Sequence, residues 1–381
     1  MPVPRTGFYL PYQRWSPWRY GETPHLQNGH WDTRVAKSNK VIMTTHLKVL
    51  IVTNSLSGGG AEISMHRLFQ SLKERDVEVE LCAINQGADF PLKSEGVHTI
   101  GRSWGSGPIE TLKNLFRFGN FLRSHKSDIV IVNCELPELY VSLISPMSSK
   151  IFVVEHTSRP WKGRRAVGFF IRTLLTIRRS RWITVSSNQQ EIWPFGSSAL
   201  YIPNPHEPVV KQSYTEKWDL VFVGRLNPGK RPEVAADAAQ ATQSTIAFFG
   251  DGPMLDKLRA DYESEKCEFK GFVTNPWSII SSDSILVVTS EYEGDGMNIV
   301  EAVLNGNPVL LSDNIDLRRF DFPDTLYFKN LEELVLKIKA AKKETPEIYK
   351  AGREQVDRLS QERDLNRVTS QWITLIRQMG E

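Results

Sequence analysis

The chain has 381 residues, more than one hydrophobic core usually serves, and this length suits two domains. Its apolar fraction of 40% and charged fraction of 24% are those of a globular protein, and a net charge of +3 is too small to indicate nucleic acid as a partner. Cys82, Cys134 and Cys267 stand far apart without metal-ligand spacing, which predicts free thiols in a reducing compartment.

Residues 1–42 interleave Pro, Trp, Tyr, Arg and Gly without a period and lack the apolar segment of a secretory signal. We expect a disordered extension or a wrongly assigned start there, and place no function in it. The longest candidate for a membrane span, 166–177, is too short and is broken by Arg172. The sequence therefore predicts a cytoplasmic protein.

Strand-like and helix-like patterns alternate from residue 48 onward. A glycine-rich turn and a helix over 61–73 follow the first strand, and alternation of this kind predicts parallel βαβ units. The apolar, β-branched runs that predict strands are 49–53, 77–84, 129–132, 151–154 and 182–185. Prolines interrupt the pattern over 201–208, which indicates a linker between domains.

The pattern then starts again and predicts a second doubly wound domain. Strands are expected at 220–223, 245–249, 285–289 and 308–311, with helices at 231–240, 254–264 and 298–304. Apolar residues at helical spacing predict an amphipathic helix over 363–379. We therefore expect an N-terminal domain over 43–204, a C-terminal domain over 205–362 and a final helix over 363–381, with the strand carboxyl ends of both domains facing one cleft.

Glu293 and Glu301 flank a glycine-bearing turn between the strand at 285–289 and the helix at 298–304. Carboxylates near a helix N-terminus are stabilised by unpaired backbone N–H groups, and ligands bind at this place in a doubly wound sheet. The alternative is a solvated acidic cap of the helix.

Glycine-rich turns occur at corresponding places in both halves. Gly59 and Gly60, in the turn 56–62, would let the backbone approach a phosphate, although tight packing explains such a turn equally well. Arg225 and Lys230, in 224–230, can converge on one anion, where arginine gives a two-pronged contact and lysine a single charge. The alternative is a pair of solvated surface cations. The turn at 250–253 is best interpreted as an ordinary β–α turn.

These motifs occur together and in order, and with them the chain resembles the retaining GT-B glycosyltransferases of the family 4 type. The resemblance is carried by Gly-Arg-Leu-x3-Lys at 224–230, Gly-Asp-Gly-Pro at 250–253, Gly-Phe-Val at 271–273, Glu-x7-Glu at 293–301 and Gly-x-Pro-Val at 306–309. It extends from residue 48 to the C-terminus and implies two Rossmann-like domains with a C-terminal helix that crosses back to the first.

The resemblance also implies a nucleotide-sugar donor, with uridine diphosphate (UDP) as the expected carrier. Arg225 and Lys230 would hold the diphosphate, Glu301 the ribose and Glu293 the donor sugar. His156, after the strand at 151–154, would reach the same sugar, although a lone histidine there is otherwise more often structural. The remaining donor-binding candidates are backbone groups near Gly296, Met297 and Asn298, the base contacts Phe272 and Val273, and the phosphate contacts Gly59 and Gly60.

In this family the leaving phosphate itself accepts the acceptor's proton, so positioning and charge stabilisation are the expected contributions of the protein. No Asp-x-Asp motif occurs in the chain, and we expect no metal in the reaction. Asp295 stands where relatives carry an aromatic or apolar residue, and it is a candidate for donor-sugar specificity. The segment 312–319 also lacks the glycine pair that is usual there. Because of these two departures, the identity of the donor sugar is not inferred from relatives.

The expected acceptor is a glycan or a lipid-linked sugar in the synthesis of a surface polysaccharide or glycoconjugate. Residues 161–181 are basic and apolar without an acid, which suits contact with the anionic inner face of the cytoplasmic membrane or, equally, a packed helix with a solvated arginine face. Alternative functions are a catalytically silent protein that binds nucleotide sugars, or another GT-B enzyme such as a phosphorylase or an epimerase.

Overall fold

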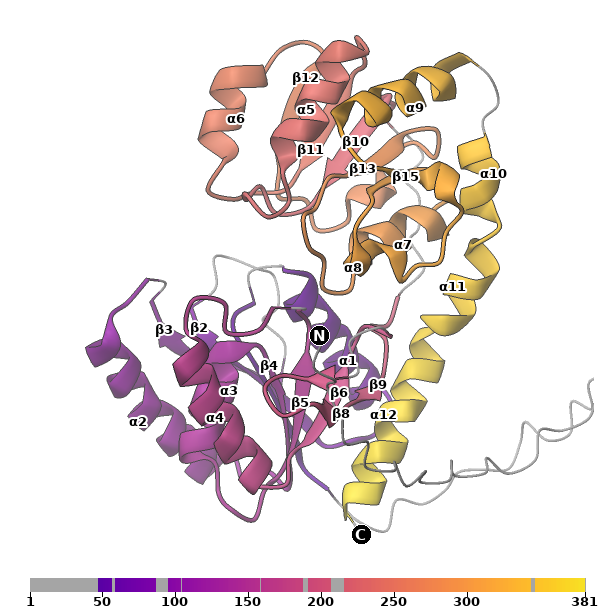
Figure 1. Ribbon diagram of the computed structural model, residues 1–381. Helices are drawn as coiled ribbons and strands as arrows, with labels where there is room; N and C mark the ends of the chain where they lie inside the picture. The colour runs from indigo at the N-terminus through magenta and orange to yellow at the C-terminus, as the bar shows by residue number, and fades with distance from the viewer. Residues whose placement is uncertain are drawn as a thin grey trace, which may run out of the picture. The chain divides into compact units, whose positions relative to one another are not determined.

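The described part of the computed structural model contains two parallel β-sheets with their helices (Figure 1). The structure describes residues 47–56, 59–86, 95–103, 105–157, 159–187, 191–206, 216–343 and 347–380, all within one unit that begins at Thr45. The predicted extension over 1–42 and part of the predicted linker lie outside these residues.

The first sheet has 7 parallel strands in the order β3-β2-β1-β4-β5-β6-β9. Its strands are β1 (Val49–Thr53), β2 (Val79–Asn85), β3 (Val97–Arg102), β4 (Ile129–Asn133), β5 (Lys150–Glu155), β6 (Arg181–Thr184) and β9 (Leu200–Tyr201). The helices are α1 (Gly60–Lys73), α2 (Pro108–Ser124), α3 (Glu135–Ile144) and α4 (Arg165–Ile177), and a short antiparallel pair joins β7 (Glu191–Ile192) to β8 (Ser197–Ser198).

The second sheet has 6 parallel strands in the order β12-β11-β10-β13-β14-β15. They are β10 (Leu220–Val223), β11 (Ile246–Phe249), β12 (Cys267–Gly271), β13 (Ile285–Val288), β14 (Val309–Ser312) and β15 (Tyr327–Phe328). The helices are α5 (Pro232–Ala241), α6 (Leu255–Tyr262), α7 (Met297–Leu304), α8 (Ile315–Arg318) and α9 (Leu331–Lys343), with 3-10 turns at Pro276–Ser278 and Asp324–Leu326.

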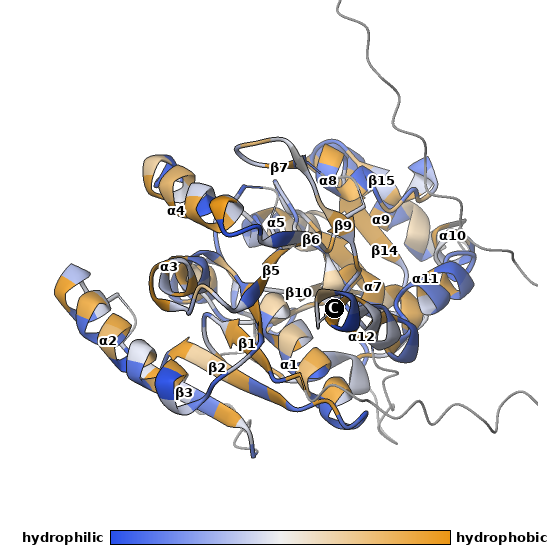
Figure 2. Ribbon diagram, turned by 90° about the horizontal axis from the view of Figure 1, so that it is seen from below, coloured by the Kyte–Doolittle hydropathy of each residue, from blue (hydrophilic) through white to orange (hydrophobic). Residues whose placement is uncertain are grey.

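The central strands of both sheets are apolar on both faces, because the crossover helices of parallel sheets cover both faces. Every residue of β1, β4, β11 and β13 is buried, and Figure 2 shows β1 and β14 as largely hydrophobic ribbons. This burial confirms the strands that were predicted from apolar runs. β3 was not predicted, since it is an edge strand without a fully buried residue and carries no apolar run.

The chain ends in three helices, α10 (Glu347–Arg353), α11 (Val356–Glu362) and α12 (Leu365–Gly380). α11 packs against α7 of the second domain, whereas α12 packs against α1 of the first. The hydroxyl groups of Ser71 and Thr369 lie 2.7 Å apart, and the ring centroids of Phe152 and Trp372 are 5.8 Å apart. The helix that crosses back to the first domain is therefore confirmed.

Within the described residues, no helix combines the length and the apolar character that crossing a membrane requires. The three cysteines are free thiols, as predicted. Burial raises the pKa of Cys134, in the turn from β4 to α3, well above its usual value.

Candidate functional site

The predicted site residues lie on turns that follow the carboxyl ends of strands in both domains, and backbone contacts bring these turns together. A Cβ on Gly60, at the start of α1, would lie 3.7 Å from the sulfur of Met297, the first residue of α7. A Cβ on Gly294 would lie 2.0 Å from the carbonyl oxygen of His156. Only glycine permits this second approach, so Gly294 fixes how closely the turn after β13 meets the turn after β5.

Lys230 and Glu293 form an ion pair at the centre of this region. Glu293 is buried, and its carboxylate also accepts hydrogen bonds from the Ser290 hydroxyl at 3.3 Å and from the Gly294 backbone at 3.2 Å. Its own backbone N–H donates to Asp316 at 3.1 Å. The Lys230 side chain is 24% exposed, so it is less buried than its partner. The lysine and the glutamate were predicted to serve different parts of the donor, and here they are neighbours.

Glu301, on α7, is held from both domains. Arg67 on α1 donates to its Oε1 at 3.3 Å, and the Trp277 indole donates to its Oε2 at 3.1 Å. Burial raises the pKa of Glu301, while Arg67 and the Trp277 bond oppose part of that rise. The two donors orient the carboxylate and leave it lone pairs with which to accept from hydroxyl groups.

Arg225 extends from the turn after β10 as an exposed cation. Burial raises the pKa of Glu62, and the positive charge of Arg225 lowers it in part, so the guanidinium lies near the start of α1. The Glu62 carboxylate in turn lies over Gly59, because a Cβ there would meet Glu62 Oε2 at 2.2 Å. This contact with Glu62 explains the glycine at position 59 just as well as the predicted approach to a phosphate does.

Asp295 is buried and already partnered. Both of its oxygens accept from Arg363 Nη1 at 2.8 Å, and one also accepts from the Asn204 amide at 2.7 Å. Arg363 precedes α12, and Asn204 belongs to the segment that follows the first domain. The carboxylate therefore joins the turn after β13 to the linker and to the segment before α12, which is a structural explanation for the departure from the family pattern.

Buried polar nitrogens without a hydrogen-bond partner among the described residues border Gly294. One is Nε2 of His156, and another is Nη2 of Arg319. Burial lowers the pKa of His156 to about 4, so its imidazole is neutral near pH 7. The other guanidinium nitrogen of Arg319, Nη1, donates to Ser186 Oγ at 2.8 Å and to the Gly294 carbonyl. Buried nitrogens without a partner are rare in folded proteins, and an ordered water or a ligand can supply the missing hydrogen bond.

The other predicted residues lie around these groups in supporting positions. Gly296 adopts φ 62° at the cap of α7, and the Asn298 amide donates to the Val223 carbonyl at 2.7 Å, which joins α7 to the end of β10. Phe272 is 46% exposed after β12, while Val273 packs against the second core. A Cβ on Gly250 would lie 1.9 Å from the Gly224 carbonyl oxygen, so the turn at 250–253 supports the turn at 224–230.

Several residues of the site have no local signal in the sequence. Arg67 belongs to an ordinary amphipathic helix, Trp277 to a short 3-10 turn, and Arg319 to the segment after α8. Each reaches the site through tertiary contacts, for example across the domains from Arg67 to Glu301 and from Arg319 to Ser186. A single sequence therefore gave no reason to select them.

Two family models match successive parts of the chain. The description "Glycosyltransferase Family 4" matches residues 58–193, and "Glycosyl transferases group 1" matches residues 204–319. The matches follow one another in the order of the two sheets. They include the glycine turn at α1 and the Glu-x7-Glu segment.

Curated relatives are bacterial glycosyltransferases. The poly(glycerol-phosphate) alpha-glucosyltransferase of Bacillus subtilis is 29% identical over 136 residues, 33% of this chain and 20% of that protein. The O-antigen biosynthesis glycosyltransferase WbnH of Escherichia coli is 33% identical over 99 residues, 26% of this chain and 29% of that protein. The matches thus span between a fifth and a third of the relatives' own length.

The fold is that of solved GT-B structures. Anabaena HepE in complex with UDP and glucose superposes with a TM-score of 0.72 at 18% identity, over 87% of this chain and 100% of that one. The pneumococcal O-GlcNAc transferase GtfA in complex with UDP and GlcNAc gives 0.68 at 12% identity, over 88% and 99%. With both sheets, the crossing helix and both family models in agreement, the chain belongs to the GT-B glycosyltransferases of the family 4 type.

Proposed function

We propose that the chain transfers a sugar from a nucleotide diphosphate, with UDP as the carrier, to a glycan or lipid-linked acceptor of a surface polysaccharide. The observation that carries this proposal is a pair of buried nitrogens, His156 Nε2 and Arg319 Nη2. Both residues contact Gly294, which follows Glu293 of the Lys230–Glu293 ion pair in the chain. A neutral imidazole and a guanidinium suit sugar hydroxyls and a phosphate, respectively. The curated relatives named above are glycosyltransferases, and the two solved structures contain UDP and a sugar.

In this proposal the donor lies between the two sheets. Arg225 and Lys230 bind the diphosphate, Glu301 accepts from the ribose hydroxyls, and Glu293 with His156 contacts the sugar. Backbone groups near Gly296, Met297 and Asn298 assist Glu293 at the sugar, and Phe272 and Val273 contact the base. Gly59 and Gly60 let the backbone of the first domain approach the phosphates. Asp295 influences specificity by positioning Gly294 and Gly296. Residues 43–204 then serve the acceptor and 205–362 the donor, with 363–381 joining them.

The reaction we propose retains the configuration at the transferred carbon. The departing phosphate accepts the acceptor's proton as the glycosidic bond breaks, and Arg225 with Lys230 stabilises the charge that develops on the diphosphate. No metal takes part in this scheme. Full transfer in the presence of a chelator is the expected result, and loss that manganese restores would refute metal independence.

Variants that remove one donor contact test the assignment. We expect Arg225→Ala and Glu293→Gln to lower kcat/KM for a UDP-sugar by about 100-fold, since each removes a charged contact worth about 3 kcal/mol. Lys257→Ala, which removes an exposed cation of α6 in the same domain, is the control and should leave transfer unchanged. Donors are first screened by thermal shift, because a bound ligand raises the melting temperature.

The same measurements separate the alternatives. A silent binding protein would show the thermal shift without transfer or hydrolysis, whereas a phosphorylase or epimerase would convert its sugar without an acceptor alcohol. Unchanged turnover in both site variants would remove the assignment of the site.

We also propose that α4 and its surroundings place the protein on the inner face of an anionic membrane. Val167, Phe169 and Phe170 on α4 are each exposed by 46% or more, and the Phe169 ring packs 5.7 Å from that of Phe195. Basic residues flank this apolar patch at 162, 164 and 165. Arg172 corrects the expectation of a wholly solvated arginine face, because its side chain is buried in the first domain.

Flotation with vesicles tests the membrane proposal. We expect binding to vesicles that contain phosphatidylglycerol, weaker binding as salt is raised, and further loss in Phe170→Ser. Leu336→Ser is the matched control, because this leucine on α9 is also exposed, by 66% against 57% for Phe170. Binding that does not depend on anionic lipid, or that both variants reduce by the same amount, would contradict the proposal.

A further inference from the structure

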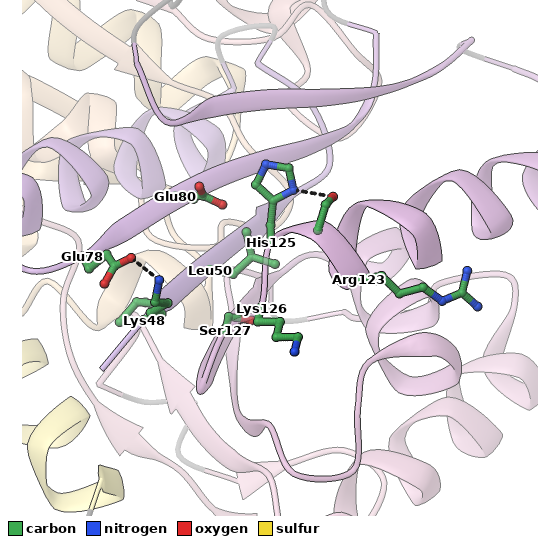
Figure 3. Close-up of a pocket in the computed structure, with 10 residues that line it drawn as sticks. Lys48, Leu50, Glu78, Glu80, Arg123, His125, Lys126 and Ser127 are labelled. Atoms are coloured by element: carbon green, nitrogen blue, oxygen red, sulfur yellow. Dashed lines mark hydrogen bonds and ion pairs between the residues drawn. The ribbon is translucent and has the colours of Figure 1, made fainter. Parts of the chain in front are cut away.

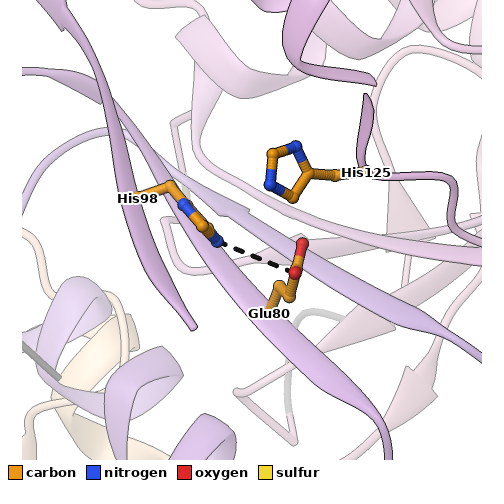
Figure 4. Close-up of side chains that lie close together, drawn as sticks. All are labelled: Glu80, His98 and His125. Atoms are coloured by element: carbon orange, nitrogen blue, oxygen red, sulfur yellow. Dashed lines mark ion pairs between the residues drawn. The ribbon is translucent and has the colours of Figure 1, made fainter. Parts of the chain in front are cut away.

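A cluster of two histidines and a glutamate lies in the first domain, away from the donor turns. Its members are Glu80 on β2, His98 on β3 and His125 directly after α2 (Figure 4). One ligand atom from each side chain lies within 4.8 Å of the others, and among the described residues this is the one group with such geometry. All three side chains are half-buried.

The sheet register explains why strand residues meet here. His98 pairs with Cys82 of the neighbouring strand, and Glu80, two residues earlier, lies on the same face as Cys82. Diagonal neighbours across two strands are within reach of long side chains. His98 Nε2 lies 3.8 Å from Glu80 Oε1, yet this buried nitrogen has no hydrogen-bond partner among the described residues.

His125 is oriented by the end of its own helix. Its Nδ1 lies 3.1 Å from the Phe121 carbonyl oxygen and 2.9 Å from Ser124 Oγ. Because a carbonyl oxygen only accepts, Nδ1 carries the proton, and the lone pair is on Nε2. A backbone carbonyl that fixes the tautomer in this way is the usual outer partner of a metal-binding histidine. The His98 and His125 rings are 4.7 Å apart, which directs both imidazoles to one region.

We infer that Glu80, His98 and His125 form a zinc site. Two imidazoles and one carboxylate are a ligand set that Zn²⁺ prefers, whereas Mg²⁺ and Ca²⁺ prefer oxygen ligands alone. Ligand atoms about 2.1 Å from a tetrahedral ion stand about 3.4 Å apart, so small side-chain rotations close the observed spacing. Glu80 and His125 also line an open cavity of about 290 Å³, which supplies room for water as the fourth ligand (Figure 3).

The cavity lies at the end of the sheet where β1 begins, opposite the carboxyl ends that carry the donor site. A bound ion would tie β2, β3 and the end of α2 together, which is a stabilising role and not a catalytic one. Lys48, also at the cavity, is paired with Glu78 at 2.6 Å, and Lys126 is exposed and screened by solvent. Nearby cations therefore do not prevent a divalent ion from binding.

Calorimetric titration of the full chain with zinc chloride tests the inference. We expect the wild type to bind one more equivalent than His98→Ala or His125→Ala, and Glu80→Gln to bind that equivalent at least about tenfold more weakly. Glu78→Gln is the matched control, because it removes a carboxylate that directly precedes β2 and lines the same cavity but is outside the cluster. Magnesium chloride should give no corresponding uptake.

A second readout makes the result independent of enzyme activity. Zinc should raise the melting temperature of the wild type and of Glu78→Gln but not that of His98→Ala, and Co²⁺ in the site should give the visible absorption of a four-coordinate ion. Equal zinc uptake by His98→Ala and wild type would overturn the proposal. A loss of zinc uptake in Glu78→Gln as large as that in His98→Ala would also overturn it, since uptake would then reflect surface charge. Neither outcome bears on the sugar-transfer proposal.

Discussion

His156 shows how burial of a single side chain sets the chemistry of the site. It follows β5, its carbonyl oxygen meets Gly294, and its Nε2 is buried without a partner among the described residues. A cationic imidazole would be poorly solvated there, so the group is neutral and can act as a hydrogen-bond partner for a sugar hydroxyl but not as a fixed charge.

This burial predicts a pH dependence of stability. Burial lowers the pKa of His156 from 6.5 to about 4, so the unfolded chain binds the proton more readily than the folded one. The stability that the neutral His156 contributes is therefore fully present above pH 6.5 and is lost as the pH falls toward about 4. We expect His156→Gln to lose less unfolding free energy over that window than the wild type, by on the order of 1–3 kcal/mol. Urea denaturation measured across the window tests this.

His206, whose pKa burial also lowers to about 4, is present in both proteins and supplies a common background. Parallel curves of stability against pH for the two proteins would contradict the interpretation of His156.

Among the elements, the turns after β10 and β11 support one another through glycine. Gly250 has φ +154°, and a Cβ there would meet the Gly224 carbonyl oxygen at 1.9 Å. The Gly224 backbone also donates to the Phe249 carbonyl at 2.9 Å. The turn that carries Arg225 and Lys230 therefore rests directly on the turn at 250–253.

We expect Gly250→Ala to destabilise the protein by about 3 kcal/mol, because backbone atoms must move to admit the methyl group. Gly105→Ala is the control, since that glycine has φ +72° but no atom within 4 Å of the added Cβ. It should cost about 1 kcal/mol of backbone strain alone. Chemical denaturation measures the unfolding free energy of both variants. Equal losses of unfolding free energy would show that the contact with Gly224 does not contribute to the cost of Gly250→Ala.

At the scale of the whole molecule, the chain end joins both domains. α11 packs on α7, and α12 packs on α1, where Trp372 is 2% exposed against Phe152. Arg363, between these helices, binds Asp295 in the turn after β13. The last helices thus connect the core of the first domain to the site in the second.

Trp372→Ala should therefore cost about 3–5 kcal/mol of unfolding free energy, through lost burial and the cavity that remains. Gln371→Ala, the exposed neighbour on the same helix, should change it by less than about 0.5 kcal/mol. Thermal and urea unfolding measure both. A small effect of Trp372→Ala would mean that α12 contributes little to the first domain.

Much of the fold was predictable from the sequence because its signals are local. Buried parallel strands require continuous apolar runs, and β1, β4, β10 and β13 appear where those runs predict them. The glycine-bearing turns at 224–230 and 250–253 were predictable for the same reason, since a close backbone approach requires glycine wherever it occurs. β3 was missed because a half-buried edge strand imposes no such pattern.

Local patterns in the sequence predict most central strands and the glycine-bearing turns, and these are enough to indicate the family. The partners of the buried charges depend on tertiary packing. Arg172 interrupts an apolar helix, yet it is buried between Glu138 and Glu155 at 2.9 and 2.6 Å. Asp295 pairs with Arg363 across 68 residues of sequence. Burying a charge is costly unless a partner compensates it, and a partner distant in the sequence is chosen by packing, which no local pattern records.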